Sequence, residues 1–518
     1  MSDFTHDLPQ PPEPSPASGA PVETSSSATI ASPVDMVAPP RKRRTALIAG
    51  LVALVIVGGT AALAMTKLRP SGTQPDVIIP ASAVAYVRVD LDPSAGQKLS
   101  AVRFMSKLPK SAADFGTDPR KALIEELRNS ATDPQLKTAL ADAESWLGNR
   151  AAASAFVTAD GTPVPFGAVE VTDEAKAKAA FASMSATSGS GDTEVTIRSG
   201  YALFTEKGKG ATLTAEIDKG TIATNATYAE DMAALGDQGV ASAWVDVAKG
   251  LDALAKSGLM PGGSVTDLQS QIGGLNKGMR FATAVRFDPD YVELAGVFRG
   301  DGLGEVAIAA PPGLGQLTSL PDDTLMGTQI NGYDKGLEKG WPDFAKSFES
   351  AADVTIADLE RGLGLRLPDD LINILGSTLT VALPDQRFGS DGPTFGVITT
   401  PKDVAEAERA LGSALEALEA PLSMSVDGPK LVVASDEAYA TRLKAGGTLG
   451  SVDGFATAVG DPSKAMYGFF INLDLFEKSY ADSFPAQWKD FVLALKSVGG
   501  SSTMSATEGT FQVRLLSN

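Results

Sequence analysis

The sequence predicts an α+β protein: an internally duplicated ectodomain of two similar halves, each a mainly antiparallel sheet with helices on one face, behind a single transmembrane helix. Three observations predict this architecture. An uncharged apolar run occupies residues 45–66, strand and helix periodicities are mixed from residue 80 onward, and short segments recur in the same order 219–241 residues later. Elements that do not alternate strictly between strand and helix favour antiparallel sheets.

Residues 1–44 are predicted to form a disordered cytoplasmic tail that ends in a basic stop. The first 40 residues contain nine Pro and seven Ser and few large apolar side chains. A segment of this composition cannot bury enough apolar surface to offset the entropy lost on folding. The stop is the run of four basic residues from Arg41 to Arg44.

Residues 45–66 are predicted to be the transmembrane helix. These 22 residues carry no charge, and a helix of this length spans roughly 30 Å of hydrocarbon. One alternative is a buried core helix. Another is a secretory signal cleaved after Ala64, because Ala62-Leu63-Ala64 has the small-x-small form of a cleavage site. About forty polar residues precede the run, whereas a signal begins near the chain start, so an uncleaved anchor is favoured.

The charges beside the apolar run predict its orientation. Arg41 to Arg44 outweigh Lys67 and Arg69 on the other side, and the more basic flank stays in the cytoplasm. We therefore expect a single-pass protein of the cell membrane with its N-terminus cytoplasmic and its ectodomain outside the cytoplasm. The lipid bilayer is its first expected partner, through residues 45–66.

The ectodomain is expected to contain a linker at 67–79, a first α+β half at 80–310 and a second α+β half at 311–518. Residues 80–92 alternate as a strand does, and Asp118-Pro119 and Asp133-Pro134 each resemble a helix N-cap followed by proline. Residues 281–298 predict a hairpin that turns at 288–290.

The second half repeats the order of the first. The matched pairs of segments are 80–90 with 321–331, 147–148 with 375–376, 166–169 with 395–398, 243–245 with 469–471, and 292–298 with 511–516. Five matches in one order favour an internal duplication. The alternative is two unrelated α+β domains that share common motifs.

Residue types exclude several classes of chemistry. The chain has no Cys, and its one His, His6, lies in the tail. A Ser-His-Asp triad, a zinc site with imidazole or thiolate ligands and an iron–sulfur cluster therefore cannot be built outside the membrane. Residues 67–518 contain 40 basic and 58 acidic residues, which argues against a nucleic-acid partner because phosphate binding needs a basic surface.

No catalytic, cofactor-binding or metal-binding residue is predicted. Motifs of the forms G-x-S-x-G, S-x-x-K and G-x-x-x-x-G-K-[ST] do not occur. Paired carboxylates can share a proton or hold a hard cation, and the chain has four such pairs, each next to Pro or at a strand end, where turn geometry alone favours Asp. These are Asp90 with Asp92, Asp288 with Asp290, Asp322 with Asp323, and Asp369 with Asp370. Trp146, Trp244 and Phe470 stand in apolar contexts that predict core positions.

The strand AVAYVRVDLDP from Ala83 to Pro93 and the W-L-G of Trp146 to Gly148, together with the tail, the membrane helix and the repeat, resemble a family of bacterial membrane proteins. This family is common in high-GC Gram-positive bacteria and is catalogued as domain of unknown function number 3352. The resemblance covers roughly residues 75–518. It implies fold and location, and it carries no activity.

The sequence therefore leads us to expect noncatalytic binding or scaffolding at the cell envelope, with a protein, a lipid or a wall component as partner. One alternative is a carrier of a lipid or other apolar ligand in a cleft between the halves. The other is an envelope enzyme that works without His or Cys.

Overall fold

The computed structural model describes residues 73–109, 119–130, 137, 141–187, 193–257, 278–300, 303, 313–352, 354–387, 392–481 and 484–518. The predicted tail, the apolar segment 45–66 and the first residues of the linker lie outside these ranges. Among the helices that are described, none has the length and apolar character needed to cross a membrane.

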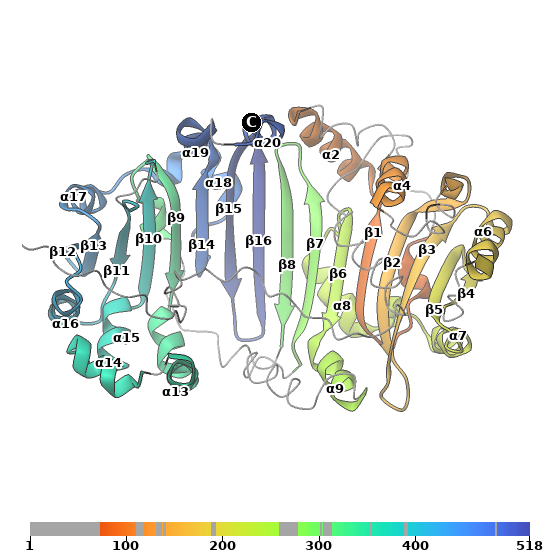
Figure 1. The fold of residues 1–518 in the computed structure, drawn as a ribbon, viewed down its shortest axis with the longest axis horizontal. Coiled ribbons are helices and arrows are strands. Elements are labelled where there is room, and N and C mark those ends of the chain that lie inside the picture. The colour runs from red at the N-terminus through yellow and green to blue at the C-terminus, as the bar shows by residue number, and fades with distance from the viewer. Residues whose placement is uncertain are drawn as a thin grey trace, which may run out of the picture. The chain divides into compact units, whose positions relative to one another are not determined.

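One sixteen-stranded antiparallel sheet forms the centre of the described fold (Figure 1). Its order is β12-β13-β11-β10-β9-β14-β15-β16-β8-β7-β6-β1-β2-β3-β5-β4. The strands are β1 (Ala83–Asp90), β2 (Leu147–Val157), β3 (Pro163–Val171), β4 (Thr193–Arg198), β5 (Tyr201–Glu206), β6 (Ala241–Asp246), β7 (Arg280–Phe287), β8 (Tyr291–Arg299), β9 (Thr324–Asn331), β10 (Thr378–Pro384), β11 (Gly396–Thr399), β12 (Ser423–Asp427), β13 (Lys430–Ala434), β14 (Tyr467–Asn472), β15 (Leu495–Met504) and β16 (Glu508–Ser517).

Helices flank the sheet and form its connections. They are η1 (Pro75–Ile78), α2 (Ala95–Lys107), α4 (Pro119–Ser130), η2 (Ala143–Ser145), α6 (Glu174–Thr187), α7 (Gly210–Lys219), η3 (Ile222–Thr224), α8 (Ala226–Leu235), α9 (Val247–Ser257), α12 (Gly315–Thr318), α13 (Tyr333–Ala352), α14 (Ile356–Leu363), α15 (Asp369–Leu375), α16 (Val404–Ala417), α17 (Glu437–Ala445), η5 (Leu449–Ser451), α18 (Phe455–Val459), α19 (Leu473–Tyr480) and α20 (Ala486–Val492). The fold is therefore α+β with a large antiparallel sheet, as the sequence predicts.

The strand order is symmetric about its centre. Read from the edge at β4, the first half runs β4-β5-β3-β2-β1-β6-β7-β8, and the same series with eight added to every number runs inward from the edge at β12. The two series meet where β8 pairs with β16. Four of the five matched pairs of segments lie on equivalent strands, as with Trp244 on β6 and Phe470 on β14, whereas 147–148 begins β2 and 375–376 ends α15. Both halves thus share one sheet, which the sequence analysis did not foresee.

Helices cover both faces of the sheet, so the expectation of helices on one face only is wrong. On the first face, α7 and α8 pack on one half, and α17 and α18 on the other. On the second face, α4 and α6 cover the outer strands of the first half, and α14, α15 and α16 those of the second. The physical reason is that the outer strands carry apolar side chains on both faces, and each face must be removed from water.

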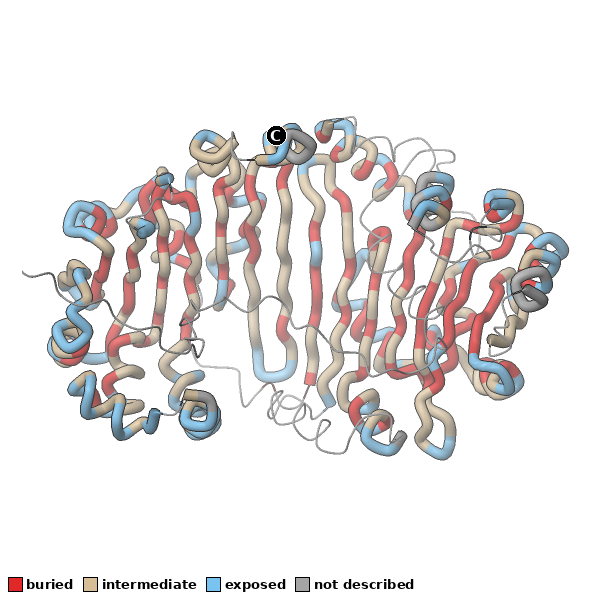
Figure 2. Tube along the Cα trace, in the orientation of Figure 1, coloured by how far each residue is buried: buried red, intermediate tan, exposed pale blue. Residues whose placement is uncertain are grey.

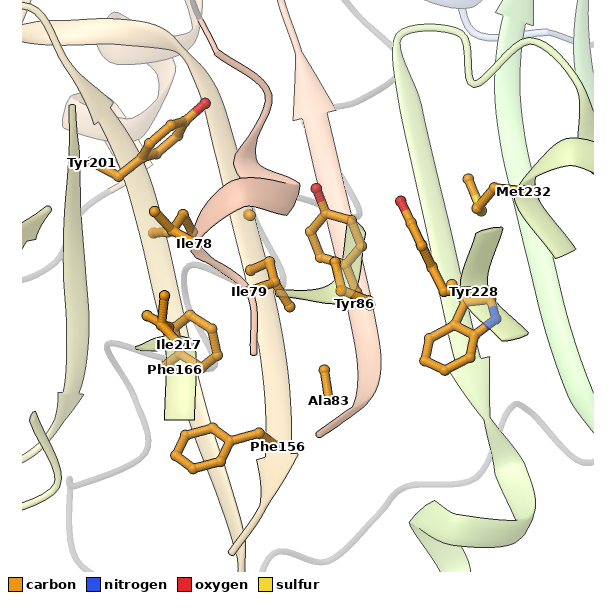
Figure 3. Packing of buried hydrophobic residues seen from close by; sticks show 14 of the residues in the cluster. Ile78, Ile79, Ala83, Tyr86, Phe156, Phe166, Tyr201, Ile217, Tyr228 and Met232 are labelled. Carbon is orange, nitrogen blue, oxygen red and sulfur yellow. The ribbon is translucent and has the colours of Figure 1, made fainter. Parts of the chain in front are cut away.

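The core of the first half lies on the first face (Figure 3). Tyr228 packs between Tyr86 and Trp244, with ring centroids 6.0 Å and 5.7 Å away. The side chains of Ile78 and Ile79 are fully buried there, so the residues around η1, assigned to the linker from sequence, belong to the folded core. The predicted core positions of Trp146, Trp244 and Phe470 are confirmed, because each is at most 5% exposed.

Candidate functional site

Three of the four carboxylate pairs named above lie in turns or at helix starts. Asp290 sits in the β7–β8 turn and accepts a hydrogen bond from Lys107 at 2.6 Å. Asp323 pairs with Arg442 near the start of β9, and Asp370 in the first turn of α15 pairs with Arg366. Their structure matches the predicted role as turn and cap residues. In the described ranges, no group of three or more His, Asp or Glu side chains is arranged to hold a metal ion.

The fourth pair, Asp90 and Asp92, lies at the end of β1, where Asp90 Oδ1 accepts a hydrogen bond from the backbone N–H of Asp92 at 2.9 Å, as the turn interpretation predicts. The pair also belongs to a buried ionic network, which the sequence analysis did not predict. The side chain of Arg150 is fully buried, with Nε 3.2 Å from Asp90 Oδ2 and Nη1 3.2 Å from Glu170 Oε1. Lys98 donates to Asp92. Burial opposes the charge of Arg150, and the carboxylates of Asp90 and Glu170 outweigh it, so the pKa of Arg150 lies above its ordinary value.

The charges of this network are paired with one another. Its three carboxylates are matched by three cations, since Arg88 also lies 4.0 Å from Asp90. Gln74 donates to Asp90 Oδ2 at 2.8 Å and accepts from Arg88, so the network also holds the first described residues against β1. Buried charges that are fully paired in this way constrain a fold.

A polar hollow of about 690 Å³ lies in the second half. The amide of Gln329 accepts from Leu317 N at 2.8 Å and donates to Gly313 O at 3.0 Å, and Asn331 donates to the same carbonyl at 2.8 Å. The amides at its floor are therefore already used within the protein. Little hydrogen-bonding capacity remains there for a ligand.

The most unusual surface of the described fold is the second face of the six central strands. We call it the central apolar face. Strand registers place on it Phe281 and Val285 of β7; Val292, Leu294 and Phe298 of β8; Phe511, Val513 and Leu515 of β16; Val498 and Met504 of β15; Tyr467, Phe469 and Ile471 of β14; and Met326 and Ile330 of β9. At about 4.8 Å between strands, the face is about 24 Å wide.

The two sides of these strands differ sharply in chemistry. The central apolar face carries no charged side chain among the residues defined above. Two threonine hydroxyls on this side bond within the sheet, as Thr283 donates to Ala295 O at 2.8 Å and Thr328 to Gly468 O at 3.1 Å. Charged and amide groups such as Glu293, Gln512 and Arg514 lie on the opposite side, under α18.

Aromatic rings lie over glycines on this face, which keeps it flat. A Cβ atom at Gly296 would overlap the ring of Phe511, and one at Gly509 would overlap the ring of Phe298. Phe511 also stacks on Phe281 with ring centroids 5.7 Å apart. The glycines therefore allow the rings to form a continuous apolar floor across β7, β8 and β16.

Within the described ranges, side chains near the strand ends cover part of this face. Phe104 of α2 packs with Phe287, Leu495 and neighbouring residues at one end. Further along, Leu294 is 42% exposed, Met326 39% and Tyr467 37%. Figure 2 shows the same feature, because β16 is intermediate in burial along most of its length whereas outer strands such as β5 are mainly buried.

Sequence reasoning missed this face although a signal was present. Phe511, Val513 and Leu515 alternate with Gln512 and Arg514 in β16. Such alternation is ordinarily interpreted as an apolar side packed on helices and a polar side in solvent. In the structure the polar set lies under α18 and the apolar set lies on the other face. Local periodicity identifies two sides of a strand but not which of them a helix covers.

Searches of this chain against protein-family models, curated proteins and solved structures find no match. The candidate function therefore depends on the geometry of the central apolar face and on the segments identified from the sequence.

Proposed function

We propose that this chain is a noncatalytic, single-pass envelope protein that holds the hydrocarbon chain of a lipid on its central apolar face. The observation that carries the proposal is the orientation of β16. Phe511, Val513 and Leu515 face away from α18, whereas Arg514 lies beneath that helix. Exposed contiguous apolar surfaces on folded proteins mark binding sites. An apolar chain is the ligand that needs only such contacts.

The strand pairing favours a lipid over a protein that adds a strand. Both β8 and β16 are paired on each side, so their backbone groups are already used within the sheet. A protein partner would therefore have to bind by side-chain contacts alone, and the face lacks the polar groups that fix the orientation of such partners. A flexible alkyl chain has no orientation of this kind to fix.

The expected membrane anchor supports the same ligand. Residues 67–72 separate the apolar segment from Thr73, the first described residue, and six extended residues reach about 20 Å. With the N-terminus cytoplasmic, this tether keeps the fold beside the outer surface of the bilayer, where lipids are the most abundant apolar molecules.

We also infer that the two halves arose by duplication and that the chain belongs with the membrane-protein family it resembles. The symmetric strand order and the five matched segments support the duplication. The central apolar face then lies at the junction of the halves. We favour the carrier alternative over an enzyme, because the buried carboxylates of Asp90, Asp92 and Glu170 are paired with cations.

A photoreactive long-chain alcohol tests the proposal. Full-length protein in its native membrane would be labelled and the modified peptides identified by mass spectrometry. We expect labels on β8, β14 and β16. Labelling of Leu294→Asp should be at least fivefold weaker, because a bound alkyl chain would remove the new carboxylate from water, which costs free energy. Leu418→Asp is the matched control, since Leu418 is 62% exposed on the end of α16, away from the face.

Three results would overturn the proposal. The alcohol could label both aspartate variants as strongly as the unaltered chain. Crosslinks could instead join the face to residues 45–66, which would make the chain's own apolar segment the occupant. Crosslinks between two copies through β8 or β16 would make the face a dimer interface.

A further inference from the structure

One carboxyl group stands at the border of the central apolar face. The helix α19 packs on β15 and β9, and its Leu473 contacts the cluster that contains Leu495 and Leu515. Glu477 follows Leu473 by four residues and therefore lies on the same side of the helix. The residue as a whole is intermediate in burial.

The carboxyl of Glu477 is partly removed from water. Oε1 of Glu477 is shielded from solvent and has no hydrogen-bond partner among the residues that the structure describes. The adjacent Phe476 stacks on Tyr480 at 4.7 Å and contacts Phe484 at 5.9 Å, between ring centroids. Burial, and in smaller part the negative charge of Asp474, raise the pKa of Glu477 to about 7. A buried carboxyl without a partner costs free energy that a bound cation would recover.

The first half shows that packing does not require this carboxyl. The helix α9 follows β6 as α19 follows β14, and the strands end at Asp246 and Asn472. Glu477 lies five residues after Asn472, and Leu251 lies five residues after Asp246, so the two positions are equivalent. Leu251 is only 6% exposed. One half therefore fills this position with an apolar side chain and the other with an acid.

We propose that Glu477 binds the headgroup of the lipid, and that this headgroup carries a primary ammonium. The inference rests on the proposed function, because the hydrocarbon chain would lie on the central apolar face. Charge complementarity selects the ammonium: Glu477 and Asp474 would attract it, whereas both would repel a carboxylate or phosphate headgroup. Partial burial strengthens the attraction, because solvent screens a partly buried charge less than an exposed one.

Three photoreactive probes with the same chain and a terminal amine, alcohol or carboxylic acid test this inference on the full-length protein in its membrane. We expect the amine to label the face about tenfold more than the alcohol, which is the effect of one charge-assisted hydrogen bond, and the acid least. Glu477→Gln should lower labelling by the amine about tenfold, to the level of the alcohol in the same variant. Glu477→Leu, which installs the residue of the equivalent position in α9, should do the same.

The control is Glu437→Gln, which removes one negative charge from an exposed position of α17 on the first face. It should retain the full preference for the amine. Equal labelling by all three probes, or an unchanged preference in Glu477→Gln, would overturn the headgroup assignment while leaving the proposed function intact. Failure of every probe to label the face would instead remove the proposed function itself.

Discussion

Arg514 of β16 donates a hydrogen bond from Nε to Oε1 of Glu293 on β8 at 2.9 Å, and this ion pair joins the two halves at the centre of the sheet. The two residues lie directly opposite each other in the β8–β16 register. Arg286 of β7 reaches the other oxygen of Glu293 at 3.3 Å. One carboxylate thus connects three neighbouring strands and both halves.

Replacing this carboxylate should weaken the whole described fold. Glu293 is 7% exposed, and Glu293→Gln leaves Arg286 and Arg514 without a compensating charge. We expect a loss of about 2 kcal/mol in the free energy of unfolding, measured by urea denaturation. Because the ion pair joins the two halves, both halves should unfold together, at a lower urea concentration than in the unaltered chain. Two separate transitions, or a midpoint equal to that of Glu437→Gln, would contradict this.

The ionic network of the first half should be more sensitive still. Arg150→Met leaves Asp90 and Glu170 buried without their cation. Removing one member of a buried pair costs about 3–5 kcal/mol. Urea denaturation measures the loss, and Arg409→Met, which breaks the exposed pair with Glu406 on α16, should leave the midpoint unchanged. A loss no larger than in the control would show that the network contributes little.

Glu477 should make stability depend on pH. Its pKa of about 7 in the folded chain lies above the ordinary value of 4.5, so the folded state binds more protons between these two values. The free energy of unfolding contributed by this group is fully present below about pH 4.5 and is lost as pH rises to about 7. The stability of Glu477→Gln relative to the unaltered chain should therefore increase as the pH is raised from about 5 to about 8. If the difference in urea midpoint between Glu477→Gln and the unaltered chain is the same at about pH 5 and about pH 8, the raised pKa is refuted.

The flat aromatic floor depends on Gly296. Gly296→Val would push the ring of Phe511 off the strand, at a cost of about 1–3 kcal/mol. It should also reduce labelling by the alkyl probes, because the raised ring breaks the continuity of the surface. Gly250→Ala in α9, where an added Cβ meets nothing within 4 Å, is the control and should leave labelling unchanged. Undiminished labelling of Gly296→Val would show that the floor need not be flat.

The expected orientation can be tested directly in cells. Protease added to intact cells should digest residues 67–518, because the positive flank at Arg41 to Arg44 predicts an outward ectodomain. Digestion would be followed with an antibody against the second half. An ectodomain that survives in intact cells and is digested only after lysis would reverse the predicted sidedness.

Several local features could be predicted from the sequence. The turn at 288–290 lies between β7 and β8, the helix expected after Asp118 begins at Pro119, and the matched segments 166–169 and 395–398 lie on β3 and β11. These features depend on backbone preferences and on side-chain alternation over a few residues, which a sequence displays directly. The ionic network of Asp90 and Asp92 could not be predicted, because Arg150 lies 60 residues from Asp90 in the sequence.

The sequence by itself determined the class of fold, most strands, the order of the repeated segments and the residue types available for chemistry. Only the tertiary structure decided that the halves join in one sheet, that helices cover both faces and that the apolar side of β16 is turned from α18. The physical reason is the separation of the interacting residues. Glu293 and Arg514 are 221 positions apart, and no local period encodes which distant strand or helix a side chain will contact.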